Sequence, residues 1–340
     1  MQRDVLCFNL PANLIAQKLI SGSEKSRLLV LIRKEKTVLH RHFKDLVDYL
    51  NKGDVLVLND TAVLPTRMWG MLDCGGQVEA TLVNRIKDNS WEALVRPDIG
   101  ARKGRSIFFK RSVLSCQLCA KTTYGGWRLT FNVDYDDDFL NKLKKIAEVN
   151  IPFYIKRQVG LKEYQNVYAR MPGSTQCPTA GLHFTKSFLE EIKRKGADVV
   201  FLALHIGGSV LPLTARDFNT FRMYKEYFEI NKETSERVNK AKQSGHKIIA
   251  VGTTVARALE TAVSKKGLVR ARSGWTDLTI KPDYGFKAIS GFLTNFHLPG
   301  SSHLLMTSAF GGLKPVLEAY RQALRKGYKF LDFGDAMLIL

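Results

Sequence analysis

The 340-residue sequence is short of long apolar runs, acidic residues and cysteines, and each shortage excludes a class of protein. No run approaches the roughly 20 apolar residues that a membrane-spanning helix needs. The opening residues, MQRDVLCFNLP, lack the basic and then apolar pattern of a secretory signal peptide, so we expect a cytoplasmic protein. The sequence also lacks internal repeats and low-complexity segments, which excludes solenoids and repeat arrays.

Five cysteines, an odd number, do not indicate a disulfide framework. Cys116 and Cys119 form one CxxC pair, but no second pair lies at a spacing that would complete a zinc site. On a strand, residues three apart also point to opposite faces. We therefore expect no metal.

The shortage of acidic residues leaves 52 Lys and Arg against 32 Asp and Glu, a net charge of +20. Such an excess fits a polyanionic partner, because basic side chains neutralise phosphates and release counterions. A merely lysine-rich surface would give the same number, so the charge alone leaves both interpretations open.

Buried strands and amphipathic helices alternate up to about residue 70 and again from 151 onward, which predicts a largely parallel sheet. One of the helices is expected to begin with a capping box of Ser187 and Glu190. Residues 71–150 instead form short alternating segments separated by turn residues, typical of an antiparallel sheet or small barrel. The predicted fold is α/β: a body of residues 1–70 and 151–340 with a mixed, largely parallel sheet, and an inserted β-barrel-like domain, 71–150. We expect the insertion to contribute little to a ligand pocket in the body.

Polar residues follow each buried strand of the body, and they are Asp60, His205 with Gly207, Thr253 with Thr254, and His297. In open α/β sheets, ligands bind in the crevice beyond the carboxyl ends of the strands. Polar residues after any one strand are also what a turn requires. Four such strand ends together favour a binding site.

The segment VGTTVARALE is typical of a strand, turn and helix that hold an anion at the helix start. It lacks the GxxxxGK[ST] pattern of nucleotide hydrolysis, which disfavours an ATPase. The hydroxyls of Thr253 and Thr254 could hold a carboxylate, such as the methionine end of a cofactor. An ordinary threonine cap is the alternative.

Two further segments carry candidate chemistry. In CPTAGLHFT, Pro178 and Gly181 restrict the loop, and His183 is a candidate acid or base, although a lone histidine is often structural. The segment PFYIKRQVGLKEYQNVYAR mixes aromatic and basic residues, a composition that suits stacked bases and phosphates but also an ordinary core. Its candidate RNA-binding residues are Tyr154, Lys156, Arg157, Tyr168 and Arg170.

Eight motifs in order along the chain resemble those of the S-adenosylmethionine:tRNA ribosyltransferase-isomerases of queuosine biosynthesis. They are LNDTAVLPTR, PFYIKRQ, YQNVYA, PTAGLHFT, LALHIGG, AVGTTVARALE, SGFLTNFHLPGSS and FGDAMLI. The resemblance implies an α/β body interrupted by a small β-barrel. It also implies transfer of the ribosyl group of S-adenosylmethionine to 7-aminomethyl-7-deazaguanine at the tRNA wobble position. Isomerisation then gives epoxyqueuosine and releases adenine and methionine, with no metal required.

The resemblance and the strand exits together predict the site residues. The expected catalytic residues are His183, His297, Glu226 and Asp60, and the two histidines are the first candidates because imidazole serves as acid or base near neutral pH. The expected S-adenosylmethionine-binding residues are His205, Gly207, Thr253, Thr254 and Arg257.

The sequence departs from the family pattern near these residues. A polar stretch after LHIGG is replaced by Ser209, Val210 and Leu211, and a Met-His-x-Glu motif has Tyr224 in place of its histidine. Residues 175–177 and 255–257 also differ. Two alternatives therefore stay open: a tRNA-binding relative without catalysis, and an enzyme that acts on another modified base.

Overall fold

The computed structural model describes residues 3–19, 26–110, 113–123, 125–207 and 220–340. The body is built on a nine-stranded mixed sheet. In spatial order its strands are β15 (Arg272–Thr276), β13 (Glu226–Ile230), β12 (Asp198–Leu204), β3 (Val55–Asn59), β14 (Ile248–Val251), β16 (Gly291–Asn295), β17 (Ala336–Ile339), β1 (Arg27–Ile32) and β2 (Thr37–His42). The central run β12–β3–β14–β16 is parallel, as is β17–β1, and every other neighbouring pair, including β16–β17, is antiparallel.

Helices cover both faces of this sheet because its central strands are apolar on both sides. The largest core cluster joins one face to the helices α3 (Lys232–Gln243), α4 (Thr253–Ala262), α5 (Ser302–Gly311) and α6 (Leu313–Arg325). A second cluster joins the other face to the 3₁₀ helix η3 (Phe43–Tyr49) and to α2 (Lys186–Arg194). We call these the α3–α6 face and the α2 face. Short 3₁₀ helices lie at Arg3–Leu6, Ala12–Leu14 and Thr179–Gly181.

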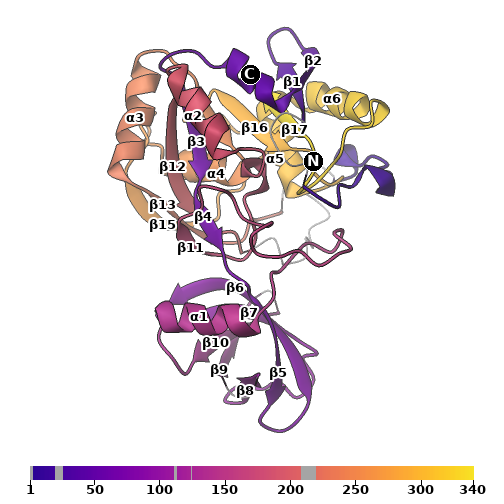
Figure 1. The fold of residues 1–340 in the computed structure, drawn as a ribbon, viewed down its shortest axis with the longest axis vertical. Coiled ribbons are helices and arrows are strands. Elements are labelled where there is room, and N and C mark those ends of the chain that lie inside the picture. Colours follow the sequence, from indigo (N-terminus) through magenta and orange to yellow (C-terminus); the bar gives the residue numbers. More distant parts are fainter. Residues whose placement is uncertain (1–2, 20–25, 111–112, 124, 208–219) are drawn as a thin grey trace.

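Below the body in Figure 1 lies a closed antiparallel barrel with its own core. Its strands are β5 (Arg67–Leu72), β6 (Gln77–Lys87), β7 (Ser90–Arg96), β8 (Ser106–Phe109), β9 (Leu114–Lys121) and β10 (Trp127–Phe131), and α1 (Asp137–Ile146) packs against it. A two-stranded ladder of β4 (Thr61–Val63) and β11 (Met171–Ser174) lies between the barrel and the body sheet. The predicted fold class, a mixed α/β body with an inserted barrel, is confirmed.

The start of α2 differs from the prediction. Thr185 is the N-cap, and its hydroxyl accepts a hydrogen bond of 3.2 Å from the Phe188 amide. Ser187 is already inside the helix, so the expected capping box of Ser187 and Glu190 is wrong. Thr185 takes the role because its extended backbone lets the side chain reach back to the first turn.

Candidate functional site

Asn59 joins several strand ends at the carboxyl edge of the sheet. Its side-chain amide donates to the Leu204 carbonyl at 2.9 Å and to the Thr254 hydroxyl at 3.1 Å. Its amide oxygen accepts from the backbone of Leu204 and Thr61. The ends of β3 and β12 and the start of α4 therefore meet at one edge, where α/β proteins bind ligands.

The start of α4 follows Gly252, whose φ of 89° gives a sharp turn that favours glycine. Because the N-cap is a glycine, it has no side chain with which to cap this helix. Thr253 and Thr254 lie in its first turn and are almost fully buried. The first-turn amides are consequently available to an anion, such as a carboxylate.

His183 is buried in the core of the α2 face. Its ring stacks on Phe43 with the centroids 4.7 Å apart, and its two nitrogens lie 3.3 Å from the Ser26 hydroxyl and 3.4 Å from the Asn295 amide. Burial lowers its pKa to about 4, so the ring is neutral at pH 7. These contacts suit a residue that positions the Asn295 side chain. The oxygen of that side chain also accepts a hydrogen bond from the Thr179 hydroxyl.

His297 lies on the other side of the sheet. Its Nε2 is 2.8 Å from the Thr294 hydroxyl, and its backbone N–H donates to the Tyr320 hydroxyl. Thr294 and Asn295 are consecutive on β16 and therefore point to opposite faces. The two histidines, both predicted as catalytic residues, therefore lie on opposite sides of β16.

His303, which the sequence reasoning missed, stacks on His297 with the ring centroids 5.2 Å apart. It lies in the first turn of α5, whose N-cap is Ser301. Burial lowers the pKa of both imidazoles. The charge of Glu226 raises the pKa of His303 and that of Arg257 lowers it. Both charged groups therefore lie close enough to His303 to interact with it electrostatically. The signal for His303 was the Ser-Ser helix start directly after the His297 motif.

Glu226 and Arg257 form a buried ion pair, with each side chain 5% exposed. Glu226 also accepts a hydrogen bond of 3.1 Å from the Gly207 amide. The guanidinium of Arg257 donates to three backbone carbonyls, those of Leu278, Tyr224 and Thr276. The pair thereby connects α4 to β13 and β15. These contacts are those of a structural link between the helix and the two strands.

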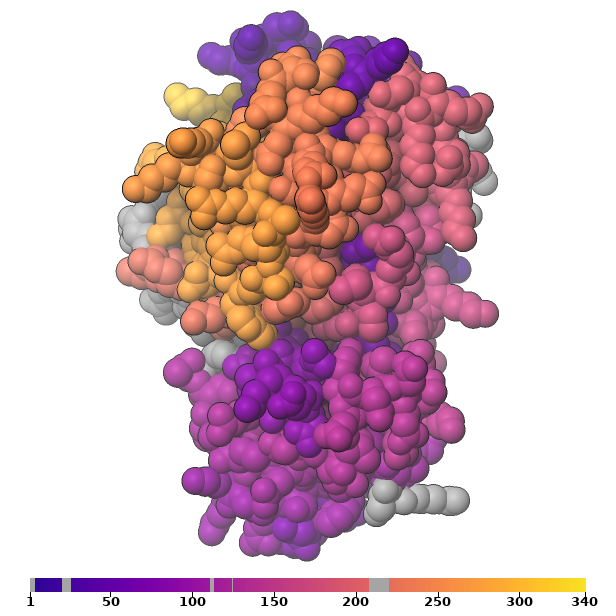
Figure 2. Space-filling view, turned by 90° about the vertical axis from the view of Figure 1, so that its left-hand side faces the viewer, coloured from indigo at the N-terminus to yellow at the C-terminus, as the bar shows by residue number. Residues whose placement is uncertain are grey.

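Gly207 lies against the barrel. A Cβ at this position would be 2.2 Å from the Val83 carbonyl oxygen on β6, so only glycine permits this approach. The neighbouring Asn84 donates to the Lys225 carbonyl at 3.1 Å. Figure 2 shows the barrel, in purple, packed directly against the body. Strand β6 of the insertion therefore contacts the body beside Gly207, while the expectation that the insertion contributes little to a ligand pocket stays a prediction.

Asp60 and His205 lie on the α2 face. Arg170 donates two hydrogen bonds, of 2.9 and 2.7 Å, to one oxygen of Asp60. Burial raises the pKa of Asp60, and Arg170 opposes that shift. The His205 Nδ1 lies 2.7 Å from the Thr61 hydroxyl, and burial followed by the charge of Arg85 lowers the pKa of His205 to about 4.

The five candidate RNA-binding residues fall into two groups. Tyr154 donates its hydroxyl to Asp332 at 2.7 Å, Arg157 pairs with Glu163, and the Tyr168 ring packs against Phe201. Lys156 and Arg170 remain exposed to solvent. Of the five candidates, only Lys156 and Arg170 combine a positive charge with an exposed side chain.

Of the departures from the family pattern, Ser209, Val210 and Leu211 lie outside the described residues. Thr175 donates its amide and its hydroxyl to the Ile206 carbonyl, each at 2.8 Å. Tyr224 contributes its carbonyl to Arg257. These two departures thus take part in the framework around the strand ends.

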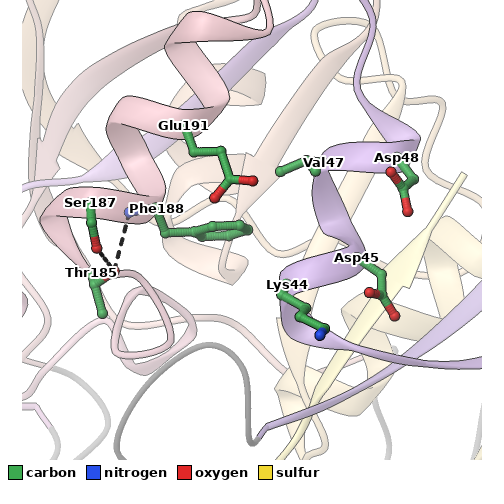
Figure 3. A pocket seen from close by; sticks show the side chains of 8 residues that line it. All are labelled: Lys44, Asp45, Val47, Asp48, Thr185, Ser187, Phe188 and Glu191. Carbon is green, nitrogen blue, oxygen red and sulfur yellow. Dashed lines mark hydrogen bonds between the residues drawn. The ribbon is translucent and has the colours of Figure 1, made fainter.

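A hollow of about 330 Å³ lies elsewhere, between η3 and α2. Figure 3 shows Phe188 pointing into it, with Lys44 and Asp45 on one side and Glu191 on the other. Its lining includes three carboxylates and one ammonium group, which does not suit a polyanion. Among the described residues, no group of three or more His, Cys, Asp or Glu could hold a metal. No helix in the described ranges is long and apolar enough to cross a bilayer.

A family model described as queuosine biosynthesis protein matches residues 4–339. The S-adenosylmethionine:tRNA ribosyltransferase-isomerase of Thermoanaerobacter sp. (strain X514) is 42% identical over all of both chains. The protein of the same name from Staphylococcus haemolyticus is 40% identical over 98% of each. A crystal structure of the S-adenosylmethionine tRNA ribosyltransferase of Thermotoga maritima is similar with a TM-score of 0.58 and 32% identity, covering 99% of this chain and 100% of that one.

Proposed function

The chain belongs to the queuosine biosynthesis protein family, and we propose that it is a tRNA-modifying transferase and isomerase. It moves the ribosyl group of S-adenosylmethionine onto 7-aminomethyl-7-deazaguanine at the wobble position of tRNA. Isomerisation gives epoxyqueuosine, with release of adenine and methionine. The observation that carries this function is similarity at about 40% identity over the whole chain to enzymes with that name.

S-adenosylmethionine, as the ribosyl donor, binds at the carboxyl edge of the sheet. The first-turn amides and hydroxyls of Thr253 and Thr254 hold its carboxylate, because a helix start carries partial positive charge. The ion pair of Glu226 and Arg257 holds the neighbouring strands in place beside the bound carboxylate. Gly207 and His205 lie at the carboxyl end of β12. No metal takes part.

His297 and His303 move the protons of the reaction. Two stacked imidazoles with lowered pKa values are neutral near pH 7, so either ring can accept a proton. One takes the proton from carbon next to sulfur, and the other assists the departing adenine. His183, which is neutral and enclosed, and Asp60, which is paired with Arg170, position neighbouring groups.

Exposed basic residues bind the tRNA phosphates, among them Lys156 and Arg170, while Tyr154, Arg157 and Tyr168 support that segment through their contacts with Asp332, Glu163 and Phe201. The substrate places the enzyme in the cytoplasm. Residues 71–150 form a separate inserted domain whose strand β6 reaches the body.

The test is incubation with S-adenosylmethionine and a tRNA that carries 7-aminomethyl-7-deazaguanine, followed by nucleoside mass analysis. We expect epoxyqueuosine together with free adenine and methionine. Binding of tRNA without any new nucleoside would favour the non-catalytic alternative. A product only on a tRNA with a different modified base would favour the other alternative.

A further inference from the structure

Three aromatic side chains form a row across neighbouring strands of the body sheet. Tyr227 on β13 is the Cα partner of Trp275 on β15, and the His205 amide donates to the Tyr227 carbonyl. The rings of His205 and Tyr227 are stacked with centroids 5.8 Å apart. Those of Tyr227 and Trp275 meet edge to face at the same distance. We call these residues the aromatic row.

The aromatic row lies on the side of β13 and β15 that faces away from α3 and α4. On β13, Phe228 and Ile230 are buried in the core with those helices, while Tyr227 and Glu229 alternate with them and are half-buried. Trp275 is 40% exposed although it is one of the largest apolar side chains in the chain. A sheet face that exposes such rings is typical of a binding surface.

One end of the aromatic row lies at the candidate site and the other at the edge of the sheet. His205 is next to Thr61, at the exit of β12, whereas β15 is the outermost strand. Nearby positive charges come from Arg85, whose charge acts on His205, and from Arg170, which is 64% exposed. Glu229 and the Arg170-paired Asp60 are acidic residues on this face, and the charge of Glu229 acts on Asp60.

We propose that the aromatic row stacks the unpaired nucleotides next to the modified one when tRNA is bound. This inference rests on the proposed function, which brings an anticodon loop to the strand exits. Unpaired bases stack on aromatic side chains regardless of sequence, and neighbouring basic groups hold their phosphates. A loop whose wobble base reaches the carboxyl edge of the sheet, which both faces share, can place its neighbouring base over Tyr227 and Trp275 on the α2 face.

The experiment measures the affinity of an anticodon stem–loop RNA for the wild-type enzyme and for Trp275→Ala. We expect the substitution to weaken binding about tenfold or more, since each stacked base contributes substantially. Trp275→Phe, which keeps a ring, should retain most of the affinity. The matched control is Trp69→Ala, because Trp69 lies on the barrel and is 46% exposed, but is outside the row. Wild-type affinity in Trp275→Ala, or an equal loss in both tryptophan variants, would overturn the proposal.

A second arm removes the base instead of the ring. An RNA with an abasic site beside the wobble position should bind the wild type more weakly than the intact RNA, yet bind Trp275→Ala as the intact RNA does. Equal losses in both proteins would show that the base contacts something else. Thermal unfolding of each variant establishes that it is folded. A wild-type enzyme that produces no modified nucleoside would count against the proposed function, whereas these binding results decide the aromatic row by themselves.

Discussion

The two faces of the body sheet each carry a carboxylate–guanidinium pair, and the pairs differ in exposure. On the α3–α6 face, Glu226 and Arg257 are both 5% exposed. On the α2 face, Asp60 is 4% exposed but its partner Arg170 is 64% exposed. The first arginine is held by three carbonyls from two other segments, and the second leaves part of its guanidinium in water.

This difference separates two tasks. A fully enclosed pair cannot leave its partners without a large cost, so it holds the architecture around the reacting groups. A half-exposed arginine can reorient toward a phosphate at little cost. The α3–α6 face therefore suits chemistry away from water, near His297 and His303. The α2 face suits contact with RNA.

The largest effect is expected from the histidines of the enclosed face. His297→Ala and His303→Ala should each lower the turnover number about 10²–10⁴-fold, the usual contribution of a positioned acid or base, while the fold and tRNA affinity are kept. The measurement is single-turnover nucleoside analysis as a function of pH. His183→Ala should instead lower stability more than turnover, because its ring contacts core groups. A His183 variant that is stable but inactive would reverse this division.

The two arginines test the comparison directly. Arg257→Ala should lower the free energy of unfolding by about 3–5 kcal/mol, because it removes the guanidinium from a buried ion pair with the Glu226 carboxylate. Arg170→Ala should lower the free energy of unfolding by only about 1–2 kcal/mol. Burial already raises the pKa of Asp60, so this carboxylate can take up a proton when its arginine is removed. Urea unfolding measures both. Similar losses in the two variants would mean that exposure does not distinguish the pairs.

The buried His183 predicts a pH dependence of stability. Its ring binds a proton below about pH 6.5 in the unfolded chain but only below about pH 4 in the folded one. Stability should therefore be fully present above pH 6.5 and fall by on the order of 2–3 kcal/mol as the pH drops to 4. His183→Gln, which cannot titrate, should show a flatter profile. An unchanged profile would assign the acid sensitivity to other groups.

The smallest effect concerns the exposed arginine and salt. The affinity for tRNA should fall steeply with salt, each neutralised phosphate adding roughly 0.7–0.9 to the log–log slope. Arg170→Ala should reduce that slope by about one such step. The control is Arg325→Ala on α6, whose side chain is 70% exposed and far along the chain from the strand exits. An equal change of the slope in both variants would mean that the positive charge acts as a general property of the surface and not through Arg170.

Sequence alone determined those features that depend on local patterns. The alternation of short segments predicted an antiparallel insertion, and polar residues after apolar strands predicted a shared carboxyl edge, which the contacts of Asn59 bear out. The motif resemblance predicted the family over the whole chain. These succeed because strand periodicity and turn composition are properties of neighbouring residues.

Tertiary structure alone decided which side chains meet. Glu226 and Arg257 were separate candidates in the sequence, but they bind each other across 31 positions. His183 and His297 looked alike as loop histidines, and only the two sides of β16 separate them. The pairing of His303 with His297, and of Trp275 with Tyr227, depends on helix packing and strand register. Such contacts are set by the whole core, because a side chain's partner is chosen by three-dimensional packing and not by its neighbours in the chain.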